Sequence, residues 1–102
     1  MAEIKLTTGN FETEVVKSEK PVLIDFFATW CGPCTMLAPV IAEIAQERDD
    51  IKVCKVDVDE EPALANMFGV QNIPTLVYFK EGKVINKAIG YKPKKDILAI
   101  LT

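Results

Sequence analysis

The stretch VLIDFFATWCGPC, residues 22–34, decides the fold of this 102-residue chain. Its first part, residues 22–28, is a continuous apolar and β-favouring run, which is typical of a central strand covered on both faces. Its second part places two cysteines three residues apart where a helical pattern begins. Residues i and i+3 of a helix share one face, so the sulfurs of Cys31 and Cys34 can meet as a disulfide or as a thiol beside a thiolate.

Cys31 stands at the expected start of the long helix, which covers residues 32–48. A sulfur in that position faces the unpaired N–H groups and the positive dipole end of the first turn, which favours thiolate over thiol. Pro33 falls in the first turn, where its missing N–H is harmless. We therefore expect Cys31 to be the reactive thiol, because it alone combines a helix N-terminus with exposure.

The rest of the chain extends this unit in both directions. The expected strands are residues 4–6, 22–28, 51–58, 75–79 and 84–89, and the expected helices begin near Asn10, Gly32, Asp59 and Pro93. Asn10 should cap the first helix, and residues 59–62 should supply the cap and acidic first turn of the third, which Gly69 stops. The last two strands are close enough, at Glu81-Gly82, for an antiparallel hairpin. This order predicts an α/β fold with helices on both faces of the sheet.

Composition excludes several classes of function. Twelve basic and fifteen acidic residues give a net charge of −3 without a basic cluster, so nucleic acid and anionic membranes have no electrostatic support as partners. Histidine is absent, which rules out Cys-His and Ser-His-Asp catalysis. The polar start, with no signal peptide or membrane span, leads us to expect a cytoplasmic protein. The length predicts a single domain over residues 1–102.

Cys-Gly-Pro-Cys after the second strand, together with Ile73-Pro74-Thr75 before the fourth, resembles the thioredoxin family over essentially the whole chain. The resemblance implies the thioredoxin fold, with a central mixed five-stranded sheet and four flanking helices. It implies a protein-disulfide reductase in which Cys31 attacks and Cys34 resolves the mixed disulfide, with no cofactor and no metal. It also implies a thioredoxin reductase and disulfide-containing proteins as partners of a monomer.

The same resemblance assigns roles to residues outside the motif. Pro74 would be a cis-proline facing the disulfide, and Asp25 and Lys55 would form a buried pair that manages the proton of Cys34. The rim that contacts partner peptides would consist of Trp30, Gly32, Pro33, Ile73, Pro74 and Gly90. The chain departs from the family at Phe27, where tryptophan is frequent, at Tyr91, where the residue is usually small, and at Thr35. Thr35 replaces a common Lys or Arg and so removes a cation beside the thiols.

Several alternatives stay open on the sequence alone. Asp25 lies within an apolar run, where a carboxylate is costly unless paired or protonated, so we favour a functional role for it. Lys55 can instead extend its ammonium out of the strand end into solvent. Cys54 lies mid-strand, which favours packing over a regulatory role. For the whole protein, the rivals are a non-catalytic binding module of the same fold and a small zinc protein.

Overall fold

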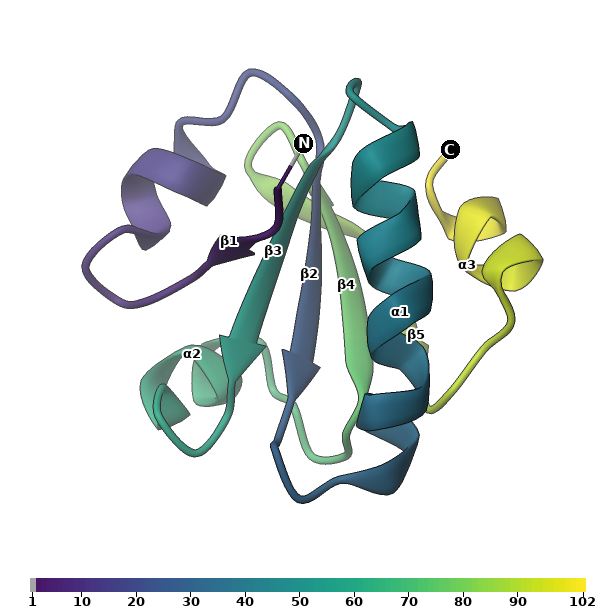
Figure 1. The fold of residues 1–102 in the computed structure, drawn as a ribbon. Helices are drawn as coiled ribbons and strands as arrows, with labels where there is room; N and C mark the ends of the chain where they lie inside the picture. Colours follow the sequence, from purple (N-terminus) through teal and green to yellow (C-terminus); the bar gives the residue numbers. More distant parts are fainter. Residues whose placement is uncertain (1) are drawn as a thin grey trace.

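The central sheet contains five strands in the order β1-β3-β2-β4-β5 in the computed structural model, which describes residues 2–102 (Figure 1). The strands are β1 (Ile4–Lys5), β2 (Val22–Phe27), β3 (Lys52–Asp57), β4 (Thr75–Lys80) and β5 (Lys83–Ile89). The helices are η1 (Glu12–Val16), α1 (Gly32–Glu47), α2 (Pro62–Met67) and α3 (Lys94–Ile100). β1, β3 and β2 run parallel, whereas β4 and β5 are antiparallel additions. The predicted mixed sheet with four flanking helices is confirmed.

Helices cover both faces of this sheet, with α1 and α3 on one side and η1 and α2 on the other (Figure 1). The central strand explains why two layers are needed, because residues 22–26 of β2 are at most 1% exposed. Alternate side chains of β2 enter opposite cores: Leu23 packs with α1 and α3, while Ile24 packs with η1 and α2. Each fully buried aliphatic side chain stabilises the fold by about 1.5–3 kcal/mol.

The β4–β5 connection is the two-residue turn expected at Glu81-Gly82. Both residues have positive φ, 52° for Glu81 and 82° for Gly82. Positive φ at both central positions is the requirement of a type I′ turn, whose twist matches that of the flanking strands. Gly82 meets this requirement without strain, because glycine has no Cβ.

Two predicted helix starts are wrong in detail. The first helix is a π-helix that begins at Glu12, and no side chain caps it. Asn10 instead accepts a hydrogen bond at Oδ1 from the N–H of Thr7, at 2.7 Å. A short amide side chain bonds to nearby backbone, and here a turn of three residues offered a better partner than the helix end.

The acidic segment before α2 supplies its N-cap residue, Glu61, as expected, but not a capping side chain. α2 has no side-chain cap and no acidic residue in its first turn. The carboxylates of the segment before α2 bind to other parts of the chain: Glu60 to Lys5, Glu61 to the N–H of Thr8, and Asp59 to the indole of Trp30. The segment therefore ties β1, Thr8 and the loop that carries Trp30 to the start of α2. Gly69, with φ of 64°, follows the end of α2 as expected.

Candidate active site

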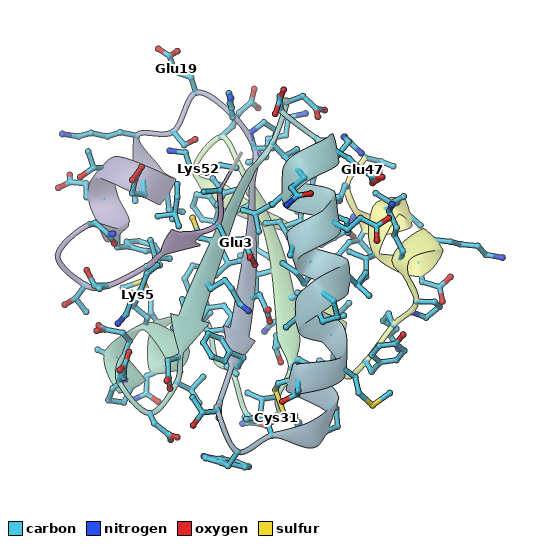
Figure 2. All side chains as sticks on the ribbon, viewed as in Figure 1. Glu3, Lys5, Glu19, Cys31, Glu47 and Lys52 are labelled. Atoms are coloured by element: carbon cyan, nitrogen blue, oxygen red, sulfur yellow. A yellow bond between two sulfur atoms is a disulfide. The ribbon has the colours of Figure 1, made fainter. Side chains whose placement is uncertain are left out.

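Cys31 and Cys34 lie where β2 passes into α1, and the structure joins them in a disulfide (Figure 2). Their Cα atoms are 5.2 Å apart, within the usual range for a disulfide. Cys31 is the N-cap of α1, and its Sγ accepts a hydrogen bond from the N–H of Cys34 at 3.2 Å. Gly32 and Pro33 complete the first turn and are exposed. The sulfur of Cys31 thus occupies the position that the sequence predicted for a stabilised thiolate.

Exposure, in contrast, does not single out Cys31. In the disulfide form Cys31 is 6% exposed and Cys34 is 4% exposed. Both pack with Ala28, and Ile73 and Val58 lie against the same cluster. The expectation of an exposed Cys31 is therefore wrong for this form, because the loop before β4 covers the sulfurs. The hydrogen bond at the helix N-terminus, rather than solvent access, distinguishes the two cysteines.

The loop that covers the disulfide contains the Ile73–Pro74 peptide bond, which is cis, as the resemblance implied. The Sγ of Cys31 is 3.9 Å from the carbonyl oxygen of Ile73. The carbonyl of Pro74 accepts a hydrogen bond from the N–H of Gly90 at 2.8 Å. Gly90 has φ of 88°, a conformation that favours glycine. The loop before β4 therefore contacts Cys31 through Ile73 and the end of β5 through Pro74.

Trp30 forms one wall of an open groove beside the disulfide. The indole is 72% exposed, and its Nε1 donates a hydrogen bond to Oδ2 of Asp59 at 2.8 Å. The groove has a volume of about 210 Å³, and apolar side chains of Val58, Val70 and Ile73 line it with Trp30. Gln71 and Asn72 also line it. A largely apolar groove with a few polar lining residues suits a peptide segment.

Asp25 and Lys55 lie next to each other on β2 and β3, where they are paired in register. The Nζ of Lys55 is 3.7 Å from Oδ2 of Asp25 and 4.6 Å from the centre of the Phe27 ring. Asp25 is 1% exposed, and burial raises its pKa from 3.8 to about 6. Lys55 opposes this increase, while the charge of Glu3 adds to it. Asp25 therefore titrates close to neutral pH, unlike an ordinary aspartate.

Glu3 is the residue that sequence reasoning missed. Its Oε1 is 4.0 Å from the Nζ of Lys55, and this oxygen is buried with no hydrogen-bond partner in the part of the chain that the structure describes. The order of strands explains the omission, because only the pairing of β1 with β3 brings the N-terminal segment to Lys55. The available signal was alternation, which places Glu3 and Lys5 on one face of the first strand and Ile4 on the other.

Cys54 lies on the opposite face of β3 and is fully buried among apolar residues. Burial raises the pKa of its thiol to about 12, so the thiolate is scarce at neutral pH. Within residues 2–102, no group of three or more cysteine, aspartate, glutamate or histidine side chains is arranged to hold a metal ion. None of the helices in this described part is long and apolar enough to cross a membrane.

Comparison with known proteins agrees with this geometry. The family model for Thioredoxin matches residues 2–102. A thioredoxin of Mycobacterium tuberculosis is 51% identical over 102 residues, which cover 99% of this chain and 88% of that protein. A thioredoxin of Alicyclobacillus acidocaldarius is 46% identical over 101 residues, covering 98% of this chain and 95% of that protein. With a Cys-Gly-Pro-Cys disulfide at the start of α1, the chain belongs to the thioredoxin family of thiol-disulfide oxidoreductases.

Proposed function

We propose that this chain reduces disulfide bonds in other proteins, with Cys31 as the attacking thiol and Cys34 as the resolving thiol. The hydrogen bond from the N–H of Cys34 to Sγ of Cys31 carries this proposal. It places one sulfur, and not the other, against the positive end of α1. In the reduced protein the same N–H stabilises a thiolate on Cys31, and the thiolate is the nucleophile in disulfide exchange.

The reaction runs in two exchange steps. The thiolate of Cys31 attacks one sulfur of the substrate disulfide, forms a mixed disulfide and releases the other substrate sulfur as a thiolate. Cys34 then loses its proton and attacks Sγ of Cys31, which breaks the mixed disulfide and releases the second substrate sulfur. The two electrons that reduce the substrate come from the two cysteines, which end as the Cys31–Cys34 disulfide. No bound cofactor takes part in these steps.

Asp25 is our candidate base for the proton of Cys34, and Lys55 is its partner. A carboxyl group with a pKa of about 6 accepts a proton near neutral pH more readily than an ordinary aspartate does. Its position beneath the start of α1, on the face that also carries Leu23, puts it on the same side of the sheet as the disulfide helix.

The substrate segment lies, in our proposal, along the groove beside Trp30. We propose that Gly32, Pro33, Ile73, Pro74 and Gly90 complete the rim that contacts the substrate. The nearby carbonyl of Ile73 and the apolar wall of Trp30 offer an extended peptide both backbone hydrogen bonding and apolar contact. Specificity for particular substrates would come from side chains that enter this groove.

A thioredoxin reductase and disulfide-containing proteins are the proposed partners, because the oxidised form must be reduced before each new cycle. We further propose that residues 1–102 act as one domain, as a monomer, in the cytoplasm. Insulin reduction tests the activity, with candidate reductases supplied in turn. Turnover with a reductase and none without a reductant is the expected result.

Trapping tests the roles of the two cysteines. Cys34→Ser should accumulate mixed disulfides with substrate proteins, because the resolving attack is lost. Iodoacetamide should label Cys31 first in the reduced protein. Preferential labelling of Cys34, or no recoverable mixed disulfide, would reverse or remove the two-step assignment.

The rival function, a non-catalytic binding module, makes a different prediction for a variant without active-site thiols. Partner binding should survive Cys31→Ser combined with Cys34→Ser if the groove alone is the functional element. If the double variant loses both disulfide reduction and partner binding, the result supports the reductase. Metal analysis of the reduced protein tests the zinc alternative directly.

A further inference from the structure

The N-terminal segment brings a second carboxylate to the Asp25–Lys55 pair. Lys55 is within 4.0 Å of two acidic side chains: its Nζ is 3.7 Å from Oδ2 of Asp25 and 4.0 Å from Oε1 of Glu3. Figure 2 shows the Glu3 side chain lying over the sheet between β1 and α1. Its side chain is only 27% exposed although it stands near the chain terminus.

The two carboxylates compete for one cation. Among residues 2–102, Oδ1 of Asp25 and Oε1 of Glu3 are both buried without a hydrogen-bond partner, so neither acid is fully satisfied within this part of the chain. With both ionised, the cluster holds two negative charges against one positive charge in a poorly solvated place. Such a cluster favours uptake of one proton. Asp25, whose side chain is 2% exposed, is the more costly group to ionise and therefore takes that proton.

Other charged groups near this face have partners elsewhere. Lys5 of β1 pairs with Glu60 at 3.2 Å, and Asp57 of β3 accepts a hydrogen bond from the N–H of Asp59. On the helices of this face, Glu43 and Glu47 of α1 both pair with Lys94 of α3. The first turn of α1 contributes Cys34. Within the described residues 2–102, the charges that act on Asp25 are those of Lys55 and Glu3.

We propose that Glu3 is a positioning residue for the resolving step, because it shares Lys55 with Asp25 and so limits how far Lys55 neutralises the aspartate. This inference rests on the proposed role of Asp25 as the base for Cys34. In the step concerned, the proton of the Cys34 thiol passes to Asp25. The Cys34 thiolate then attacks Sγ of Cys31, the mixed disulfide breaks, and the substrate sulfur leaves as a thiolate.

Replacing Glu3 by an uncharged residue of the same shape should release Lys55 to Asp25. In Glu3→Gln the carboxylate of Asp25 is better compensated, so its titration should move to lower pH, by less than about one unit for a charge at this distance. The low-pH limb of the rate of resolution should move in the same direction. A weaker base also accepts the Cys34 proton less readily, so the rate at neutral pH should fall by less than about tenfold.

The matched control is Glu14→Gln. Glu14 also pairs with a lysine of β3, Lys52, at 3.1 Å. Lys52 is three residues from Lys55, so alternation directs it to the opposite face of the sheet. This variant removes the same charge and breaks a shorter ion pair, and it should leave both the titration of Asp25 and the pH profile of resolution unchanged.

Carbon NMR of aspartate-labelled oxidised protein measures the titration of Asp25, and stopped-flow release of a chromophoric thiol from a mixed disulfide at Cys31 measures resolution. Both are followed for the wild type, Glu3→Gln, Glu14→Gln, Asp25→Asn and the double variant Glu3→Gln with Asp25→Asn. We expect the effect of Glu3→Gln on resolution to vanish in the Asp25→Asn background, because Glu3 acts through Asp25.

The outcomes separate the two proposals. An unchanged Asp25 titration in Glu3→Gln, with slow resolution in Asp25→Asn, overturns the role of Glu3 and leaves the base in place. Normal resolution in Asp25→Asn removes Asp25 from the mechanism, and the inference about Glu3 fails with it. An equal shift in Glu14→Gln would attribute the effect to net charge and also overturn the role of Glu3.

Discussion

The two faces of the β2–β3 ladder show how one sheet separates reactive from inert groups. On one face Asp25 pairs with Lys55, and one register position earlier, on the other face, Ile24 pairs with Cys54. The first pair meets a second carboxylate and lies beneath the helix that carries the disulfide. The second pair lies in an apolar core around the rings of Phe26 and Phe68. A shift of one residue therefore decides whether a side chain lies on the face of the ionisable pair or in the apolar core.

The strongest test of this comparison is the loss of one thiol on each face. Cys31→Ser should reduce disulfide reduction by at least about three orders of magnitude, because the attacking nucleophile is gone. Cys54→Ser should keep near wild-type activity in the same insulin assay. A comparable loss in both variants would break the distinction between the faces.

Asp25→Asn should slow the resolving step by about 10- to 100-fold while stabilising the folded protein, since it removes a base and a buried charge together. The pKa of Asp25 rises from 3.8 to about 6 on folding, so the native state holds more protons between these values and stability falls as pH rises through them. Above about pH 6 the full destabilisation is present, about 3 kcal/mol at about 1.4 kcal/mol per pH unit. The substitution Asp25→Asn removes this destabilisation, although a buried amide without hydrogen-bond partners restores part of it.

Urea unfolding at several pH values checks this prediction, with stopped-flow kinetics for the resolving step. The difference in free energy of unfolding between variant and wild type should be small below about pH 4 and full above about pH 6. A variant that is less stable than the wild type at neutral pH would indicate that the pair with Lys55 is net favourable.

On the apolar face, the expected effects concern stability alone. Cys54→Ser should lower the free energy of unfolding by about 1–3 kcal/mol, because a hydroxyl replaces a thiol where no water reaches. Iodoacetamide should leave Cys54 unlabelled until the protein unfolds, as burial raises its pKa to about 12. Rapid labelling in the folded protein would show that this face opens on its own.

The smallest expected effect concerns Thr35, in the first turn of α1, and the pKa of the Cys31 thiol. Thr35 is exposed, and its hydroxyl donates a hydrogen bond to the carbonyl of Cys31 at 3.2 Å. Thr35→Lys should raise the thiolate fraction of Cys31, moving the midpoint of a thiolate absorbance titration down by less than about one pH unit. Thr35→Gln is the uncharged control. An equal shift in both variants would attribute the change to the lost hydroxyl.

The strand–helix order and the position of the two cysteines could be predicted from the sequence, because both depend on local patterns. The apolar run of residues 22–28 predicted a central strand, and the helix after it placed Cys31 at an N-cap. Which strands lie next to each other could not be predicted in the same way. The sequence of residues 2–6 does not show that β1 pairs with β3, so the approach of Glu3 to Lys55 could not be predicted.

Short polar segments were misread for a related physical reason. Carboxylates just before a helix commonly serve its N-terminus, yet Asp59, Glu60 and Glu61 found partners on the active-site loop and near β1. A side chain with several possible partners takes the one that tertiary packing brings close. The same competition moved Asn10 from a helix cap to a turn.

The strand order also fixes when the site can form during synthesis. Asp25 is flanked by β3 and β4, so it stays in water until residues up to Lys80 have left the ribosome. At a translation rate of about 5–20 residues per second, this happens about 2 to 9 seconds after Cys34 emerges. During that interval the nascent chain carries two cysteines without the buried carboxyl beneath them. If Asp25 is the base for Cys34, as we propose, the resolving step becomes possible only after β4 has been added.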